Sequence, residues 1–246
     1  MDTHIVSIPL ERLVVAFVPA LVVVAILWRW SLDYRNALYA LFRMSVQLLL
    51  IGYLLIVLFA AEGSAPVLAV LVVMVTASGW IALGPVKARR RALFRHALCS
   101  IALGGGITLV LATQVVLQLE PWYEPQYLIP LAGMTFSTAM NRVSLAAERF
   151  YAELENGLEV RAARDIALRS SLIPIVNSLL AVGLVALPGM MTGQLLAGIS
   201  PLIATRYQMM VMCMLFGASG LAAAMFLTLL VRDHDTASNE PIPETA

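Results

Sequence analysis

Methionine, amide and hydroxyl side chains are concentrated in three apolar stretches of the C-terminal half of this sequence. Thioether sulfur is a soft donor that suits soft metal ions, whereas amide and hydroxyl oxygens are harder donors. The same residue types also fill apolar cores and bridge neighbouring helices, so packing is the alternative role for each. The candidates for lining a substrate path are Met134, Met140 and Asn141, then Asn177, Ser178, Met190, Met191 and Thr192, then Gln208 and Met209.

Residue patterns typical of enzymes are missing. The sequence has no G-x-x-x-x-G-K-[ST] phosphate loop, no H-E-x-x-H and no Cys/His cluster with metal-site spacing. The histidines, His4, His96 and His234, are expected in loops or tails. Cys99 and Cys213 lie in separate apolar runs and are expected to be buried small hydrophobes rather than a disulfide. We therefore predict a chain that is not an enzyme and binds no cofactor of its own, with its metal chemistry, if any, unknown.

The elements that must position these residues are membrane helices. Of the 246 residues, 61% are hydrophobic and only 13% are charged, and the mean hydropathy is +0.87. Runs of about twenty apolar residues are long enough to cross a bilayer. We predict an all-α, polytopic integral membrane protein with about seven spans, at 13–28, 38–60, 66–86, 97–118, 127–147, 172–199 and 206–231. The net charge of +1 gives no reason to expect a nucleic-acid partner.

The basic residues predict the orientation. Placing the N-terminus outside leaves only Arg12 and Arg206 on the outer side and puts twelve basic residues inside, in line with the positive-inside rule. We predict a multi-pass protein of the cytoplasmic (inner) membrane with a cytoplasmic C-terminus. The N-terminus lacks a basic signal-peptide start and is expected to be a retained first span. Residues 1–232 are expected to form one transmembrane domain, and the polar tail, 233–246, is expected to be disordered.

A break is expected in the middle of the run at 172–199. Pro188 removes a backbone donor and Gly189 removes side-chain restraint, so the helix should end or kink near Leu187. Backbone groups freed inside a membrane must be buried in protein or line a wet cavity. Two interpretations stay open: a pathway element lined by Met190 and Met191, or a turn at the outer edge followed by a short outer helix.

The segment 148–170 is expected on the cytoplasmic side. Phe150, Leu154, Leu158, Ala162 and Ile166 form a rough apolar stripe at helical spacing, which Asn156-Gly157 can divide into two short helices. One interpretation is an amphipathic helix on the lipid surface, and the other is a docking element for a soluble partner. The candidate coupling residues are Glu153, Leu154, Asn156, Gly157, Leu158, Arg161 and Arg164.

The sequence also resembles a known family. The block "SLIPIVNSLLAVGLVALPGMMTGQLLAGISPLIATRYQMMVMCML" is similar to the most distinctive part of the FetB-type iron-export permeases, to which plant aluminium-resistance permeases are related. "ALFRMSVQLLLIGYLL" and "LIPLAGMTFSTAMNRVSLA" resemble the second and fifth helices of that family. The matching positions are Arg43, Gln47, Gly52, Pro130, Gly133, Met134, Asn141, Pro174, Asn177, Ser178, Pro188, Gly189, Met190, Met191, Gly193, Pro201, Tyr207 and Gln208. Some relatives have a carboxylate at position 177, where this chain has the neutral Asn177.

The resemblance implies the membrane permease of an ABC transporter that exports a metal ion, most readily iron. ATP and Mg²⁺ would then bind to a separate ATPase subunit that docks on the 148–170 segment. A chain of this size with seven spans is half a transporter, so two copies are expected with two ATPase chains. The alternatives are a secondary transporter or channel that works without ATP, a membrane scaffold subunit without transport, and a sugar nucleotide linked to aluminium resistance as the substrate.

Overall fold

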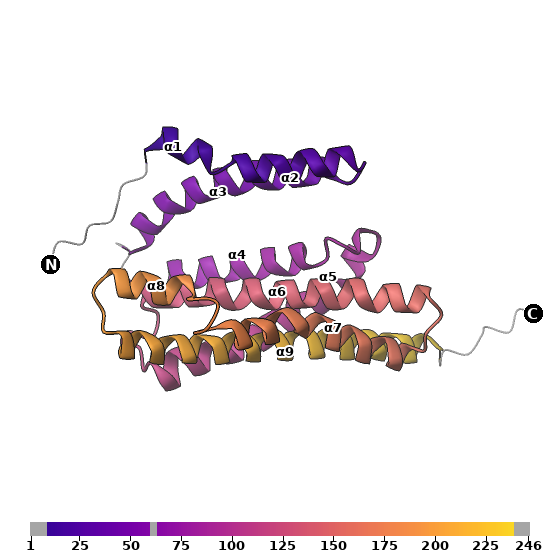
Figure 1. Cartoon of the computed structure of the whole chain (residues 1–246). Helices are drawn as coiled ribbons and strands as arrows, with labels where there is room; N and C mark the ends of the chain where they lie inside the picture. Colours follow the sequence, from indigo (N-terminus) through magenta and orange to yellow (C-terminus); the bar gives the residue numbers. More distant parts are fainter. Residues whose placement is uncertain (1–8, 60–62, 239–246) are drawn as a thin grey trace, which may run out of the picture. The chain divides into compact units, whose positions relative to one another are not determined.

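The computed structural model describes residues 9–59 and 63–238 and divides at residue 62 into two units (Figure 1). Within those described ranges the chain is helical, and its only β-type pairing is an isolated bridge between Val182 and Ala186. The expectation of an all-α fold is confirmed. The first unit ends at Glu62 and the second begins at Gly63.

The first unit is a helical hairpin. Helix α1 (Leu10–Val15) is followed by α2 (Val18–Arg29), in which Pro19 occupies the first turn, where the missing N–H is tolerated. A tight turn leads into α3 (Tyr34–Phe59), and the backbone N–H of Asn36 donates to the Asp33 carboxylate at 3.2 Å. The side chains of α2 are apolar on all sides and none is buried, as expected of a helix whose surface meets lipid or another chain.

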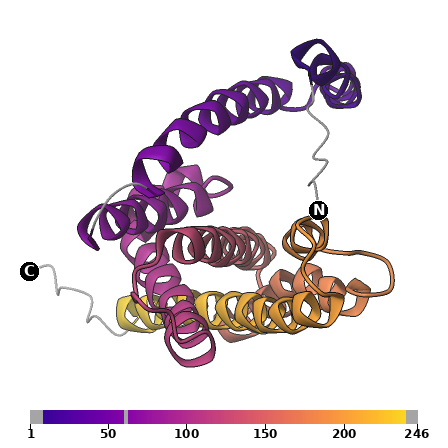
Figure 2. The same cartoon turned by 90° about the vertical axis from the view of Figure 1, so that its left-hand side faces the viewer.

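The second unit is a bundle of long helices (Figures 1 and 2). Its helix α9 packs against α5, α6, α7 and α8, and α6 packs against α4, α5 and α7. In chain order the elements are α4 (Ala65–Ala82), η1 (Lys87–Arg89), α5 (Arg90–Val110), η2 (Leu111–Val116), α6 (Pro125–Glu155), α7 (Val160–Ala181), α8 (Gly189–Leu196) and α9 (Pro201–Ser238).

Small residues let α5 and α9 approach closely. A Cβ on Gly104 would lie 2.6 Å from the backbone nitrogen of Ala222, so no side chain fits at this crossing. The same Cβ on Gly106 would meet nothing within 4 Å. The triple-glycine motif therefore serves helix packing at its first position, as is typical of membrane helix contacts.

Five helical segments of the described chain are long and apolar enough to cross a membrane. They are Glu11–Arg29, Tyr34–Ile56, Ala65–Ala82, Lys87–Val116 and Pro201–Thr236. Helices α6 and α7 also coincide with predicted runs, but each carries a charged end that lowers its average hydropathy. The seven-span count stays a prediction.

Basic residues of the second unit are concentrated at one end of the bundle, which we call the basic end: Lys87, Arg89, Arg90 and Arg91 at η1 and the start of α5, Arg149 near the end of α6, and Arg161 and Arg164 at the start of α7. The last turns of α9 lie at the same end (Figure 1). Two contacts tie these elements together. The Arg89 guanidinium lies 4.2 Å from the centre of the Tyr151 ring, and His96 Nε2 lies 3.3 Å from Asp233 Oδ2. The connection 117–124 and α8 lie at the opposite end of the bundle (Figure 1), which we call the outer end after the orientation predicted from the basic residues.

Two expectations about the basic end need correction. Helix α9 continues to Ser238, so residues 233–238 of the predicted disordered tail are helical, and 239–246 lie outside the described residues. The helix continues because His234 contacts the Phe150 ring, at 6.0 Å between ring centres, and Asp233 faces His96. His96 itself lies on α5 and not in a loop.

Candidate functional site

Helix α7 ends before Pro188-Gly189, the place where the sequence predicts a break within the sixth run. Helix α7 ends at Ala181, and the Ala181 carbonyl accepts from the N–H groups of Val185 at 2.8 Å and Ala186 at 3.1 Å. Gly183, at φ +82°, supplies the left-handed conformation that reverses the chain. Pro188 is instead the N-cap of α8, with φ −62° and ψ 148°. The helix thus stops at a glycine turn, and the proline starts the next helix.

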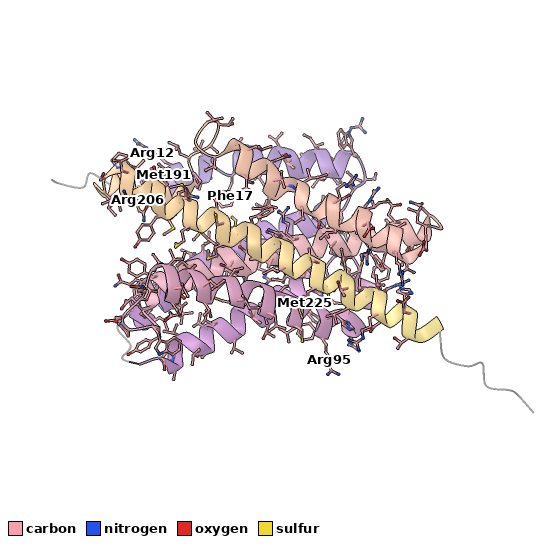
Figure 3. The ribbon with its side chains drawn as sticks, turned by 90° about the horizontal axis from the view of Figure 1, so that it is seen from below. Arg12, Phe17, Arg95, Met191, Arg206 and Met225 are labelled. Carbon is pink, nitrogen blue, oxygen red and sulfur yellow. The ribbon has the colours of Figure 1, made fainter. Side chains whose placement is uncertain are left out.

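The position of α8 favours the outer-edge interpretation of this break. Met191 shares a pocket with residues 205–213 of α9, which begins at Pro201. At 1.5 Å per residue those residues lie within about 18 Å of the start of a helix about 57 Å long. Figure 3 shows Met191 next to Arg206 at the start of α9, far along the helix from Met225. Helix α8 therefore lies at the outer end of the bundle rather than at its middle.

The pocket between α7, α8 and α9 has a volume of about 550 Å³, and we call it the α8 pocket. It brings together three of the residues predicted from the sequence: Met191, Gln208 and Met209. The remaining lining residues are Leu179, Val182, Gly183, Leu187, Thr205, Met212 and Cys213. Met212 and Cys213 were not among the predicted path residues, although they share the helical face of Met209 at spacings of three and four.

Gln208 is the most unusual side chain of the α8 pocket. It is only 5% exposed, and its Oε1 atom has no hydrogen-bond partner among the described residues. Buried polar atoms normally have a partner, so an unpartnered amide oxygen beside a pocket marks a place where a ligand can bind. Thr205, also in this lining, uses its hydroxyl to donate to the Pro201 carbonyl at 2.8 Å.

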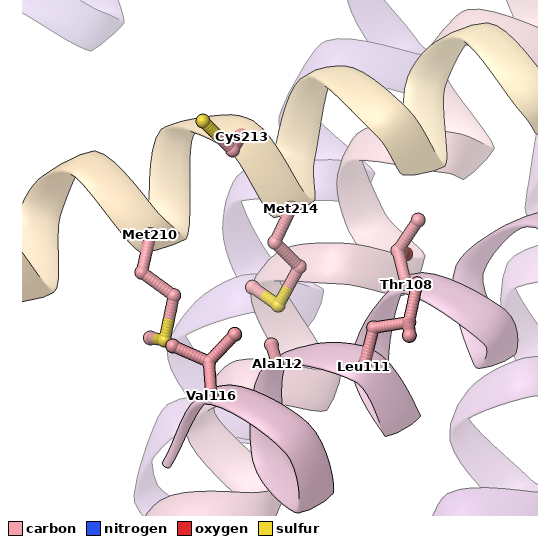
Figure 4. Close-up of a pocket in the computed structure, with 7 residues that line it drawn as sticks. All are labelled: Thr108, Leu111, Ala112, Val116, Met210, Cys213 and Met214. Atoms are coloured by element: carbon pink, nitrogen blue, oxygen red, sulfur yellow. The ribbon is translucent and has the colours of Figure 1, made fainter.

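A second pocket lies on another side of α9, against η2 (Figure 4). Its volume is about 280 Å³, and Met210 and Met214 face Ala112 and Val116 across it, while Cys213 points away from both methionines. The η2 segment is a π-helix, a widened turn that is frequent at functional sites. Thioethers therefore line two sides of the same part of α9.

The other predicted path residues do not line the α8 pocket. Asn141 and Asn177 are exposed, and the Ser178 hydroxyl donates to the Pro174 carbonyl of its own helix at 2.9 Å. The Thr192 hydroxyl donates to the Pro188 carbonyl, one turn earlier in the chain, at 3.2 Å. Met134 and Met140, on α6, and Met190, on α8, are half-buried.

Both cysteines differ from their expectation as buried hydrophobes. Cys99 and Cys213 are free thiols and are exposed in the chain. Their helices are apolar, but in the described part of the chain neither cysteine side chain is buried against its neighbours. In the described part of the chain no three His, Cys, Asp or Glu side chains are grouped to hold a metal ion.

The coupling segment forms the α6–α7 hairpin at the basic end. Helix α6 ends at Glu155, Gly157 adopts φ +83°, and the N–H groups of Gly157 and Leu158 donate to Leu154 and Glu153 carbonyls. This pair of hydrogen bonds around a left-handed glycine is a common way to end a helix. The segment thus consists of the ends of two long helices and not of two short ones. Because the chain reverses at Gly157, the predicted stripe is not continuous, and Ala163 and Ala167 are buried on α7 in its place.

The candidate coupling residues have different environments. Asn156, Gly157 and Arg161 are exposed, and Leu154, Leu158 and Arg164 are half-buried. Arg164 forms an ion pair with Asp165 at 2.7 Å. Glu153 is 6% exposed and pairs with Arg149, so it stabilises the end of α6 rather than presenting a charge to a partner. Burial raises the pKa of the neighbouring Tyr151 phenol, and Arg89 over its ring opposes that shift.

Comparison with known proteins assigns the family. The model of an uncharacterised protein family, UPF0014, matches residues 10–234. The chain belongs to this family. A UPF0014 membrane protein of Synechocystis is 36% identical over 207 residues, covering 78% of this chain and 80% of that protein. The "Probable iron export permease protein FetB" of Escherichia coli is 32% identical, with 93% of each chain covered. Protein ALUMINUM SENSITIVE 3 of Arabidopsis thaliana is 31% identical over 82% of this chain and 80% of its own.

No solved structure gives a significant match to this UPF0014 chain. The resemblance to FetB-type permeases and their plant relatives, drawn from the "LPGMMTG" block and the fifth-helix motif, is confirmed. The Synechocystis relative is named a membrane protein, which agrees with the long apolar helices of both units.

Proposed function

We propose that this chain is the membrane permease of an ABC exporter for metal ions, with iron as the first candidate substrate. The observation that carries the proposal is the similarity to the Escherichia coli protein named a probable iron export permease, which extends over 93% of both chains. Similarity over nearly the whole length includes the α6–α7 hairpin and the α8 pocket, so it does not depend on one shared motif.

ATP hydrolysis would take place on a separate subunit. The sequence has no phosphate loop of its own, so ATP and Mg²⁺ would bind to a partner ATPase. The α6–α7 hairpin is the docking candidate, because it projects from the basic end with Asn156 and Gly157 exposed at its tip. Closure of the ATPase dimer would move this hairpin and, through α7, the α8 pocket at the outer end.

The arrangement in the membrane follows the charge distribution. The basic end would face the cytoplasm, with the outer end across the inner membrane, as the positive-inside rule requires. Two copies of the chain would assemble with two ATPase chains.

The test is purification of the tagged chain in mild detergent from its own host. We expect a P-loop ATPase to co-purify in stoichiometric amount, with a hydrolysis rate that rises when Fe²⁺ is added. A stable chain without an ATPase would contradict the ABC assignment and favour an ATP-independent transporter or a scaffold subunit. If the ATP hydrolysis rate rose with a sugar nucleotide and not with Fe²⁺, the proposed iron substrate would be wrong and the ABC assignment would stand.

A further inference from the structure

The α8 pocket has one helical face of α9 as its main wall. Thr205, Gln208, Met209, Met212 and Cys213 follow each other along α9 at spacings that place them on one side of the helix. Helix α8 contributes Met191 from the other side. The pocket therefore joins side chains of α8 and α9, and the turn at Gly183 that leads from α7 to α8 forms another part of its lining.

The donor set of this pocket is neutral and rich in sulfur. Met191, Met209 and Met212 offer three thioethers, Cys213 offers a thiol, and no charged residue is part of the lining. Soft thioether and thiol donors select ions such as Cu⁺, whereas Mg²⁺ and other hard cations prefer carboxylates and water. A neutral lining in an apolar surrounding also favours a single positive charge, because the penalty for burying an ion rises steeply with its charge.

Gln208 adds an oxygen donor to the same lining. Its side chain is more than nine-tenths buried, and Oε1 accepts no hydrogen bond from any described residue. The sulfur atoms around it cannot donate to it effectively, so the partner that suits this oxygen is a cation or a donor group of a ligand.

We propose that the α8 pocket is a binding site for a soft monovalent cation, of the Cu⁺ or Ag⁺ type, held by the thioethers of Met191, Met209 and Met212 and by the Gln208 amide oxygen. The Cys213 thiol can join as a thiolate by releasing its proton to solvent. This inference rests on the proposed export function for its biological meaning, and it adds soft monovalent cations to iron as a class of ion that the permease can bind. Fe²⁺, which prefers nitrogen and oxygen ligands, should bind more weakly here.

The test uses Ag⁺ as the probe on the full chain purified in detergent, in a chloride-free nitrate buffer so that silver stays in solution. The background variant is Cys99→Ala with Cys213→Ala, because each of these exposed thiols would bind silver by itself. Calorimetric titration should show one saturable Ag⁺ site per chain. The double change Met209→Leu with Met212→Leu should weaken it by at least about tenfold, the scale on which a disturbed metal site loses affinity.

Two matched controls remove the same number of thioethers elsewhere. Met210→Leu with Met214→Leu removes the thioethers of the neighbouring pocket on η2, and Met74→Leu with Met225→Leu changes two methionines that line neither pocket. Both controls should bind Ag⁺ within about twofold of the background, because the ligand set is intact. If the first double variant does not elute as a single folded species, Met191→Leu on the short α8 gives the same test.

Several results would overturn the inference. They are the absence of a saturable Ag⁺ site, an Ag⁺ affinity of the α8-pocket variant equal to that of the background, a loss of Ag⁺ affinity in either control as large as in the α8-pocket variant, or Fe²⁺ binding as tightly as Ag⁺. The titration needs no ATPase, so it separates the two proposals. Silver binding in the α8 pocket by a chain that captures no ATPase would support the site and sink the ABC assignment. A metal-stimulated ATPase complex together with unchanged Ag⁺ binding in the α8-pocket variant would support the ABC assignment and contradict the proposed Ag⁺ site.

Discussion

Gly104 is the residue that most narrowly limits the packing of the second unit. Because its Cβ would lie 2.6 Å from the Ala222 nitrogen and 2.9 Å from the Ala222 Cα, backbone would have to move to admit a methyl group. We expect Gly104→Ala to lower the free energy of unfolding by about 1–3 kcal/mol, the usual effect of overpacking. Thermal unfolding in detergent, followed by tryptophan fluorescence, measures the loss as a lower Tm.

Gly106→Ala is the matched control for this change. It lies in the same helix two residues on, with open space around the added methyl group, and alanine has the better helix propensity. Its Tm should stay equal to that of the unchanged chain or rise. Equal destabilisation by both substitutions would mean that α5 and α9 do not cross at Gly104.

At the scale of elements, the α6–α7 hairpin depends on the backbone of Gly157. Its φ of +83° is incompatible with proline, and its N–H donates to the Leu154 carbonyl at 3.0 Å, a bond that proline removes. We expect Gly157→Pro to distort the hairpin and reduce ATPase co-purification by more than about tenfold, since a few central residues carry most of the energy of an interface. The ratio of ATPase to permease on a denaturing gel gives the readout.

The outer end provides a control with nearly the same backbone. Gly198 also has φ +83°, and its N–H donates to the Leu195 carbonyl at 3.0 Å. Gly198→Pro therefore removes the same kind of hydrogen bond and forces the same change of φ in the turn between α8 and α9. This variant should keep its ATPase. Equal loss in the two variants would show that general instability, and not hairpin docking, explains the effect.

Elements were more predictable from the sequence than the places where they end. Each of the seven apolar runs overlaps at least one helix, because twenty-residue hydrophobicity is a strong and local signal, but the run at 172–199 is divided between α7 and α8. The helices α6 and α9 extend past the runs at 127–147 and 206–231, since a helix can continue outside lipid where charged residues take over. The turn at Gly183 ends α7 before Pro188. The sequence alone did not indicate which of these two helix-breaking residues would end the helix.

The candidate site was predictable from residue types but not from the positions of those residues on their helices. Residue types pointed to Met191, Gln208 and Met209, and the α8 pocket brings them together. That Cys213 lines the α8 pocket became clear only from its position on α9. A cysteine within an apolar run does not indicate which side of its helix faces a pocket. Asn141 and Asn177, chosen by the same chemistry, remain outside this pocket since they lie on other helix faces.

At the scale of the whole molecule, the second unit predicts which segments are on the same side of the membrane. Single cysteines in a chain carrying Cys99→Ala and Cys213→Ala can be probed in intact cells with a maleimide that does not cross membranes. We expect Gln118→Cys and Ser200→Cys, at the outer end, to react, and Asn156→Cys, at the tip of the α6–α7 hairpin, to stay unlabelled.

Lysis should make the Asn156→Cys chain react, which shows that its thiol was shielded by the membrane and not by folding. The opposite labelling pattern in intact cells would mean that the orientation is inverted. Labelling of all three positions before lysis would contradict a second unit that spans the bilayer from end to end.

The widened turn of η2 also sets the rotational phase of everything that follows it. A π-type turn holds one residue more than an α-turn, and each residue of a regular helix adds about 100° of rotation. In a regular α-helix, Val116 would point about 100° away from its present direction and would no longer face Met210. The contact between Val116 and Met210 therefore depends on the extra residue of η2. Deleting one residue within η2 would allow a regular α-helix in which Val116 still faces Met210, whereas a regular α-helix with the full number of residues would turn Val116 away.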